Sequence, residues 1–136
     1  MDLRAKFGLN QKLEADGIDL HLGGDAYITV RPAGMINRRY AVKVNELLQR
    51  ERRASLGDLD PDTVEALTLE AYSTAVCVGW RGVELDGQAL DCTPDNFRRV
   101  MREIPALWEI VKREAANLGN FRSAEVQELG KRSGTG

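Results

Sequence analysis

The side chains most often used in catalysis are few in this sequence. His21 is the single histidine, and it lies in a run of alternating apolar and polar residues, so we expect it to face solvent from a strand. Cys77 lies in an apolar run and is predicted to be a small core residue. Cys92 comes just before a predicted helix start, where a thiolate would be stabilised. Because neither cysteine has a histidine near it in the sequence, no activated nucleophile is predicted, and we expect the protein not to be an enzyme.

Metal and nucleotide sites are not predicted either. Asp58, Asp60 and Asp62 have the alternating spacing of calcium loops, but they lack the glycine and the distal glutamate of that motif. Gly23-Gly24 is not followed by the helix that a dinucleotide site requires. The two cysteines fit no metal spacing and are predicted to stay reduced rather than to form a disulfide. We therefore expect no catalytic residue, no cofactor and no metal site.

Charge is balanced over the chain but divided into blocks. The sequence has 19 Lys and Arg and 21 Asp and Glu, for a net charge of -2, so no overall basic excess indicates nucleic-acid binding. Residues 36–53 hold six basic and two acidic side chains, whereas residues 54–96 hold nine acidic and one basic. Attraction between these blocks would act within one chain or between the copies of a homo-oligomer. For the second case, the predicted self-association residues are Arg50, Arg52 and Arg53.

A phosphate-binding use of the same basic block is the less favoured interpretation. Phosphate contacts need a basic surface, and single-stranded nucleic acids also need aromatic side chains on which bases stack. The acidic middle of the chain opposes the first requirement, and no aromatic residues are interleaved with the arginines to meet the second. Nucleic acid is therefore not an expected partner.

Length and composition favour one globular domain over residues 1–136. The 136 residues are 43% hydrophobic and 29% charged, and no apolar stretch is long enough to cross a bilayer. Residues 1–16 and 131–136 are expected to be flexible ends, and the N-terminus lacks the apolar segment of a secretory signal. Residues 17–31 are predicted to form a β-hairpin, because two alternating runs flank the turn-forming pair Gly23-Gly24 and end at Pro32.

Helical patterns are predicted for the rest of the chain. The expected helices cover residues 37–53, 61–78, 93–104 and 105–118, with one more short helix around 121–129. Asn37, Asp60 and Thr93 are the predicted capping residues, and Pro105 is expected to break the chain between two helices. The helix over residues 61–78 is apolar on two adjoining faces, so we expect it at the centre. The predicted fold class is mainly α (α+β), with a small N-terminal β-hairpin packed on a bundle of about four to five helices.

Four motifs follow one another in an order and spacing typical of one family. They are Val30-Arg31-Pro32-Ala33-Gly34 with Asn37-Arg38-Arg39-Tyr40; the helix-like run from Glu70 to Gly79-Trp80; Asp86-Gly87 before Cys92-Thr93-Pro94-Asp95-Asn96; and Ile104-Pro105-Ala106-Leu107-Trp108 with Asn120-Phe121-Arg122. Together these motifs resemble tail assembly chaperones of long-tailed, siphovirus-like bacteriophages or prophages.

This resemblance implies a function in virion assembly. A protein of this kind binds the phage tape measure protein and keeps it soluble and extended for tail-tube polymerisation, without a cofactor. The implied further partners are the tail tube protein and a longer frameshift form of the same chain. The implied location is the host bacterial cytoplasm, with no copies left in the mature virion. Phe121, Val126 and Leu129 lie at the end that a frameshift would extend, and they are the predicted partner-binding residues.

Two other function classes remain open at the level of sequence. The first is a small structural component of the virion, such as a tail completion or connector protein, which would be found in purified particles. The second is a regulatory or inhibitory binding module that acts on nucleic acid or on a host protein, and salt-sensitive DNA binding would favour it.

Overall fold

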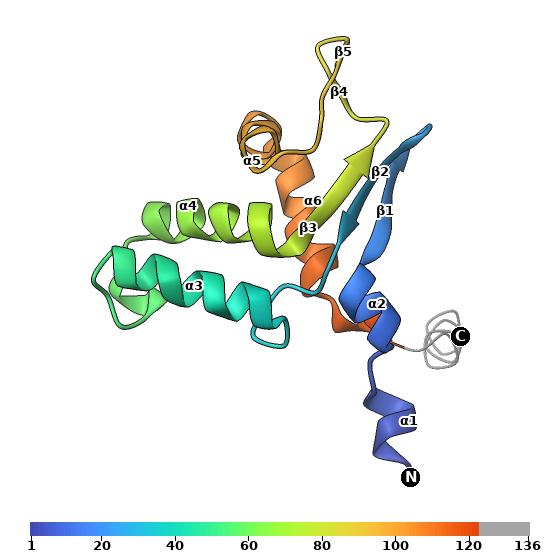
Figure 1. Cartoon of the computed structure of the whole chain (residues 1–136), viewed down its shortest axis with the longest axis vertical. Coiled ribbons are helices and arrows are strands. Elements are labelled where there is room, and N and C mark those ends of the chain that lie inside the picture. The colour runs from blue at the N-terminus through green and yellow to red at the C-terminus, as the bar shows by residue number, and fades with distance from the viewer. Residues whose placement is uncertain (123–136) are drawn as a thin grey trace.

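Three antiparallel strands lie at the middle of the structure, a computed structural model that describes residues 1–122 (Figure 1). In chain order the elements are α1 (Leu3–Phe7), α2 (Gln11–Asp16), β1 (Ile18–Gly23), β2 (Ala26–Val30), α3 (Arg38–Arg50), a 3₁₀ turn (Leu56–Asp58), α4 (Pro61–Ala71), a π-helical turn (Tyr72–Val76), β3 (Cys77–Arg81), β4 (Glu84–Leu85), β5 (Gln88–Ala89), α5 (Pro94–Glu103), α6 (Pro105–Ala116) and a second 3₁₀ turn (Leu118–Phe121). In the view of Figure 1, α2, α3 and α4 lie at one end of the sheet and α6 lies behind it, whereas the hairpin end is not covered by a helix.

The predicted hairpin is confirmed, and it is part of a larger sheet. β1 pairs with β2 across a two-residue turn at Gly24 and Asp25, one position later than predicted, because Gly23 ends β1 and pairs with Ala26. Gly23 and Gly24 both have positive φ, and β2 pairs in turn with β3. Thr29 lies opposite Gly79 and Val30 opposite Cys77, so Val78 is an extra residue that forms a β-bulge in β3. β4 and β5 form a separate two-stranded ribbon that projects from the body beside α5 (Figure 1).

The predicted fold class, mainly helical with a lone hairpin, is wrong, because the described chain is a mixed α+β fold. The helix expected over residues 61–78 ends at Ala71, passes through one π-helical turn and becomes strand β3. Gly79 lies within that strand and does not close a helix. A short apolar run fits helical and extended periodicity equally well, so its neighbours decide. Here β2 offers an unpaired edge, and pairing with β3 satisfies its backbone groups.

Two apolar clusters hold these elements together. The larger one joins the sheet to α5, α6 and the π-helical turn, and Phe97, Phe121, Ile28 and Val111 have no exposed surface in it. The smaller one lies between α3 and α4, and its buried residues are Val44, Leu47, Leu48, Leu67 and Ala71. The prediction that the segment after Pro61 is central is confirmed only from Leu67 to Val76, because residues 61–66 include no buried side chain, and the segment is not one helix.

The predicted helix starts agree with the structure. Asn37 accepts a hydrogen bond from the Tyr40 N–H, and Thr93 accepts one from the Asn96 N–H. Pro105 is the first residue of α6, and Ile104 before it has the non-helical φ of −128° and ψ of 77°, so the expected break is present. Capping side chains and prolines act within a few residues, so the local sequence was enough to predict these helix starts.

Two short helices occupy residues 1–16, where the sequence predicted no regular element. Neither helix has a fully buried residue, but α2 is tied to the body because the partly buried Leu13 and, just before the helix, Leu9 pack on the larger cluster. The Asn10 N–H also donates to the Phe121 carbonyl at 2.8 Å, which joins the two ends of the described chain. Residues 131–136, the other expected flexible end, lie outside the described residues. Within residues 1–122, no helix has both the length and the apolar character needed to span a membrane.

Candidate functional site: an exposed strip on α3

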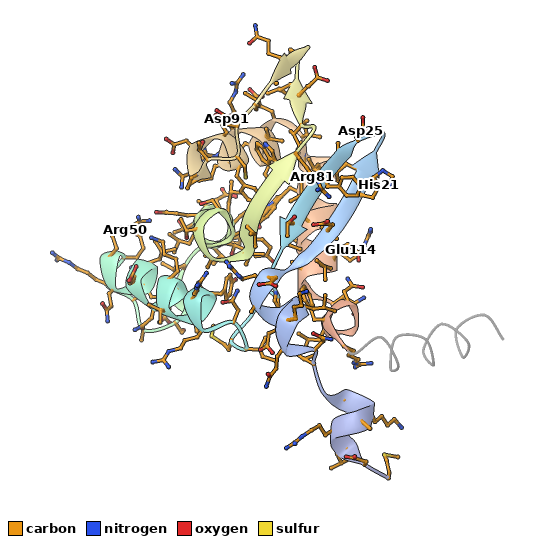
Figure 2. The ribbon with its side chains drawn as sticks, turned by 45° about the vertical axis from the view of Figure 1, so that its right-hand side comes forward. His21, Asp25, Arg50, Arg81, Asp91 and Glu114 are labelled. Atoms are coloured by element: carbon orange, nitrogen blue, oxygen red, sulfur yellow. The ribbon has the colours of Figure 1, made fainter. Side chains whose placement is uncertain are left out.

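The lone histidine belongs to the hairpin. His21 stacks on Tyr27 with 4.7 Å between ring centroids, and its Nε2 lies 2.9 Å from the Gly24 carbonyl. Arg81 covers the same Tyr27 ring and forms an ion pair of 3.2 Å with Asp19, so these groups form one layer on the sheet (Figure 2). Across the part of the chain that the structure describes, no three His, Cys, Asp or Glu side chains are grouped to hold a metal ion.

The predicted self-association residues lie at the far end of α3. Arg50 forms a two-pronged ion pair with Glu70 of α4, with both N···O distances at 3.0 Å, and these hydrogen bonds lower the pKa of Glu70 (Figure 2). Arg50 of the basic block is therefore paired with a residue of the acidic block within the same chain. Arg52 has a φ of 56° and ends the helix, while the Arg53 N–H donates to the Leu48 carbonyl at 2.9 Å. Both side chains are exposed.

The predicted partner-binding residues do not form a surface in the described part of the chain. Phe121 is 0% exposed and belongs to the larger core cluster. Its side chain therefore stabilises the fold and offers no contact area to a partner. Val126 and Leu129 lie outside the described residues.

A different surface has the chemistry of a binding site, and it lies on the outer side of α3. The inner side of this helix carries Tyr40 and the buried Val44, Leu47 and Leu48. The outer side carries residues that are exposed or partly exposed at helical spacing, and we call them, with Ile36 just before the helix, the α3 strip: Ile36, Arg38, Arg39, Val42 and Lys43. Val42 is 50% exposed and Ile36 is 46% exposed, so the strip is apolar as well as basic.

The surface is hollowed on both sides of the α3 strip. A groove of about 500 Å³ runs between α3 and the π-helical turn, and its lining is Arg38, Arg39, Val42, Lys43, Glu46, Thr74 and Ala75. A second hollow of about 340 Å³ lies toward α2 and shares Arg38 and Arg39 with the first. An apolar surface between cations suits a helical segment that has an apolar stripe and flanking acidic residues.

The second hollow is mainly positive, because its lining has three arginines and one glutamate, Glu14. Arg31 lines this hollow beside Arg38 and Arg39, and its Nε donates to the Ala15 carbonyl at 2.6 Å. Partial burial and the nearby charge of Arg39 lower the pKa of Arg31. The positive charges of these arginines repel one another, so a carboxylate that lies among them would be attracted.

The backbone under the α3 strip is fixed by a buried amide. Asn37 is 8% exposed, and its Nδ2 donates to the carbonyls of Pro32 and Ala75, each at 2.9 Å. Its Oδ1 caps α3. One side chain therefore ties the end of the hairpin, the start of α3 and the π-helical turn together. Sequence reasoning identified only the cap, since the two carbonyl partners are set by the tertiary fold.

The α3 strip itself was not predicted from the sequence. The signal that could have shown it is Val42, an apolar residue on the polar side of a helix whose inner side was correctly identified. An isolated exposed apolar residue is common on protein surfaces, so Val42 indicates a site only together with the groove beside it.

Comparison with known protein families gives the origin of the chain. Residues 36–132 match the family described as YdaY prophage protein. The chain belongs to this family. The phage or prophage origin predicted from the motifs is therefore confirmed. The matched range begins at Ile36, so it contains the whole α3 strip of this YdaY family member and leaves out the β1–β2 hairpin. No curated protein and no solved structure matches the chain.

Proposed function

We propose that this YdaY prophage protein is a tail assembly chaperone, which binds the tape measure protein and keeps it soluble and extended during tail-tube polymerisation. The observation that carries the proposal is the α3 strip, an apolar and basic surface beside a groove of about 500 Å³ in a protein of prophage origin. The order of the four sequence motifs supports the same assignment. The proposed protein acts without catalysis or cofactor, in the host bacterial cytoplasm, and is absent from the mature virion.

The chemistry of the α3 strip suits a long helical client. Such a client exposes apolar stripes that would aggregate in water, and Val42 and Ile36 can cover them while Arg38 and Arg39 attract flanking carboxylates. A surface this small gives weak binding for each copy. Many copies along one client would raise the effective concentration of their neighbours and hold it extended. The tail tube protein and a longer frameshift form are further proposed partners.

The test is co-expression of the chain with the tape measure protein of the same prophage. We expect the soluble fraction of the client to rise with the parent chain and to fall about tenfold with Val42→Asp, since a carboxylate in the groove opposes burial of the client. Ile110→Asp is the matched control, because Ile110 is 39% exposed on α6 and lies outside the groove. With Ile110→Asp, the soluble fraction of the client should equal that with the parent chain.

Two results would overturn the proposal. One is a client that stays insoluble with the parent chain even when a longer frameshift form is also supplied. The other is recovery of the chain as a constant component of purified particles, which would favour a structural role in the virion.

A further inference from the structure

Two cysteines that are fifteen positions apart in sequence meet in the fold. Cys77 begins β3, and Cys92 lies between β5 and α5. Their Sγ atoms are 3.6 Å apart. The sequence predicted that these residues stay reduced and gave no reason to pair them, because the contact depends on β3 being a strand. A helix continued through Cys77, as the periodicity suggested, would have placed its side chain elsewhere.

Both ends of this contact are held by hydrogen bonds. Cys77 pairs with Val30 in the sheet. On the other side, the indole Nε1 of Trp80 donates to the Leu90 carbonyl at 2.7 Å, and the Asn96 Nδ2 donates to the Asp91 carbonyl at 2.9 Å. The segment that carries Cys92 is therefore fixed against both β3 and the start of α5.

The two thiols differ in surroundings. Cys92 lines an open hollow of about 430 Å³ together with Trp80, Leu90 and the β4–β5 ribbon, whereas Cys77 does not line it. The hydrogen bond from the Cys77 thiol, aided by the backbone N–H of Trp80, lowers the pKa of Cys92 against the effect of partial burial. The same thiol contact, together with burial, raises the pKa of Cys77. Cys92 is thus the more accessible sulfur and the one that ionises first.

We propose that Cys77 and Cys92 form a reactive dithiol, which low-molecular-weight disulfides such as glutathione disulfide convert into an intrachain disulfide. The Cys92 thiolate attacks one sulfur of the reagent, the reagent's S–S bond breaks, and one glutathione thiolate leaves. The Cys77 Sγ then attacks the Cys92 Sγ as the second glutathione leaves, and its proton goes to that thiolate. Two protein thiols are oxidised, and one reagent disulfide is reduced to two thiols.

The distance to be closed is small. A disulfide bond is about 2.05 Å long, so the two sulfurs must approach by roughly 1.5 Å. Rotation of the two side chains about their Cα–Cβ bonds supplies this movement while the hydrogen bonds of the backbone are kept. The bond would tie β3 to the start of α5 across the base of the β4–β5 ribbon.

The experiment treats the reduced full chain with glutathione disulfide, followed by alkylation and peptide mass mapping. We expect a Cys77–Cys92 linked peptide pair, a protein mass lower by two hydrogens, and a melting temperature higher by about 4 °C or more, because closing a loop restricts the unfolded chain. Stable glutathione adducts without the linked pair, or disulfides between chains, would overturn the proposal.

Single substitutions test the assigned order of reaction. Cys77→Ser should accumulate a stable glutathione adduct at Cys92, since the second attack is lost. Cys92→Ser should leave Cys77 at least tenfold slower to react, because that thiol is partly buried and does not line the open hollow. Both variants are first checked for native circular dichroism. Equal reaction rates of the two variants would then contradict the assigned order. If a variant is unstable, the linked peptide pair from the parent chain still shows whether the disulfide forms.

Discussion

Asn37 is the residue on which the position of the α3 strip depends most directly. Its side chain makes three hydrogen bonds to backbone groups of three segments, and it is buried. A buried amide that satisfies two carbonyls cannot be replaced without leaving acceptors unpaired. The strip begins at the adjacent residue, so an error in this anchor would move the groove as well as the helix start.

Asn37→Ala should therefore lower the free energy of unfolding by about 2–4 kcal/mol, through loss of the helix cap and of two buried partners. Asn37→Asp should be nearly as costly, because it keeps the cap but replaces the amide donors with an acceptor. Asn45→Ala is the matched control on the exposed side of α3, with an expected change below about 0.5 kcal/mol. Chemical denaturation measures all three, and equal losses at the two positions would show that the buried contacts contribute little.

At the scale of the elements, one interaction joins α4 to α6. The Glu65 carboxylate accepts hydrogen bonds from the buried Trp108 indole and from Lys112, the latter at 3.0 Å. Partial burial of Glu65 opposes its ionisation, but these two hydrogen bonds outweigh it and lower its pKa. A carboxylate with a lowered pKa in the folded state stabilises the fold above its unfolded pKa, and this contribution is lost as pH falls through the folded pKa.

Glu65→Gln should thus destabilise the fold at pH 7 and have progressively less effect below about pH 4, near the unfolded pKa of a glutamate. The side chain is 52% exposed, so solvent screening limits the loss at pH 7 to about 1 kcal/mol or less. Glu103→Gln, which removes only an exposed pair with Arg99 on α5, is the control. Denaturation curves at several pH values measure the difference, and a loss that persists unchanged at pH 3 would rule out the charge as its source.

Some of these elements could be predicted from the sequence and others could not. Helix starts at Asn37, Asp60 and Thr93 and the break at Pro105 depend on local chemistry, and the structure has them. The change from helix to β3 depends on the free edge of β2, which lies more than forty residues earlier, so helical periodicity misidentified Cys77 and Val78 and did not show the π-helical form of residues 72–76. The candidate site was missed for a related reason, because the groove forms only when the π-helical turn lies beside α3.

Association of whole molecules through their oppositely charged blocks remains a prediction. Arg50 is paired within the chain, so Arg52 and Arg53 are the exposed cations left at that end of α3 to meet the acidic block of a second copy. Light scattering should show the mass of the parent chain falling as salt rises above about 0.15 M, where the screening length is about 8 Å. Changing Arg52 and Arg53 to Glu should reduce assembly at low salt.

The control for self-association carries the same change of charge elsewhere. Lys6 and Lys12 are exposed on α1 and α2, and their replacement by Glu should leave assembly near that of the parent. Equal loss in both double variants would mean that net charge, rather than contact at the end of α3, controls the association. Equal assembly of the parent chain and both double variants would show that Arg52 and Arg53 make no contact between copies.

Photo-cross-linking in cells would show whether the α3 strip contacts the tape measure protein. A photoreactive amino acid placed at position 42 or at position 110 would be activated in cells that co-express the client. Both positions are exposed apolar sites on helices, at 50% and 39%, so the two chains should fold alike. We expect strong cross-linking to the tape measure protein from position 42 and at most about a tenth as much from position 110. Equal yields from both positions, or none from position 42 with a soluble client, would contradict this expectation.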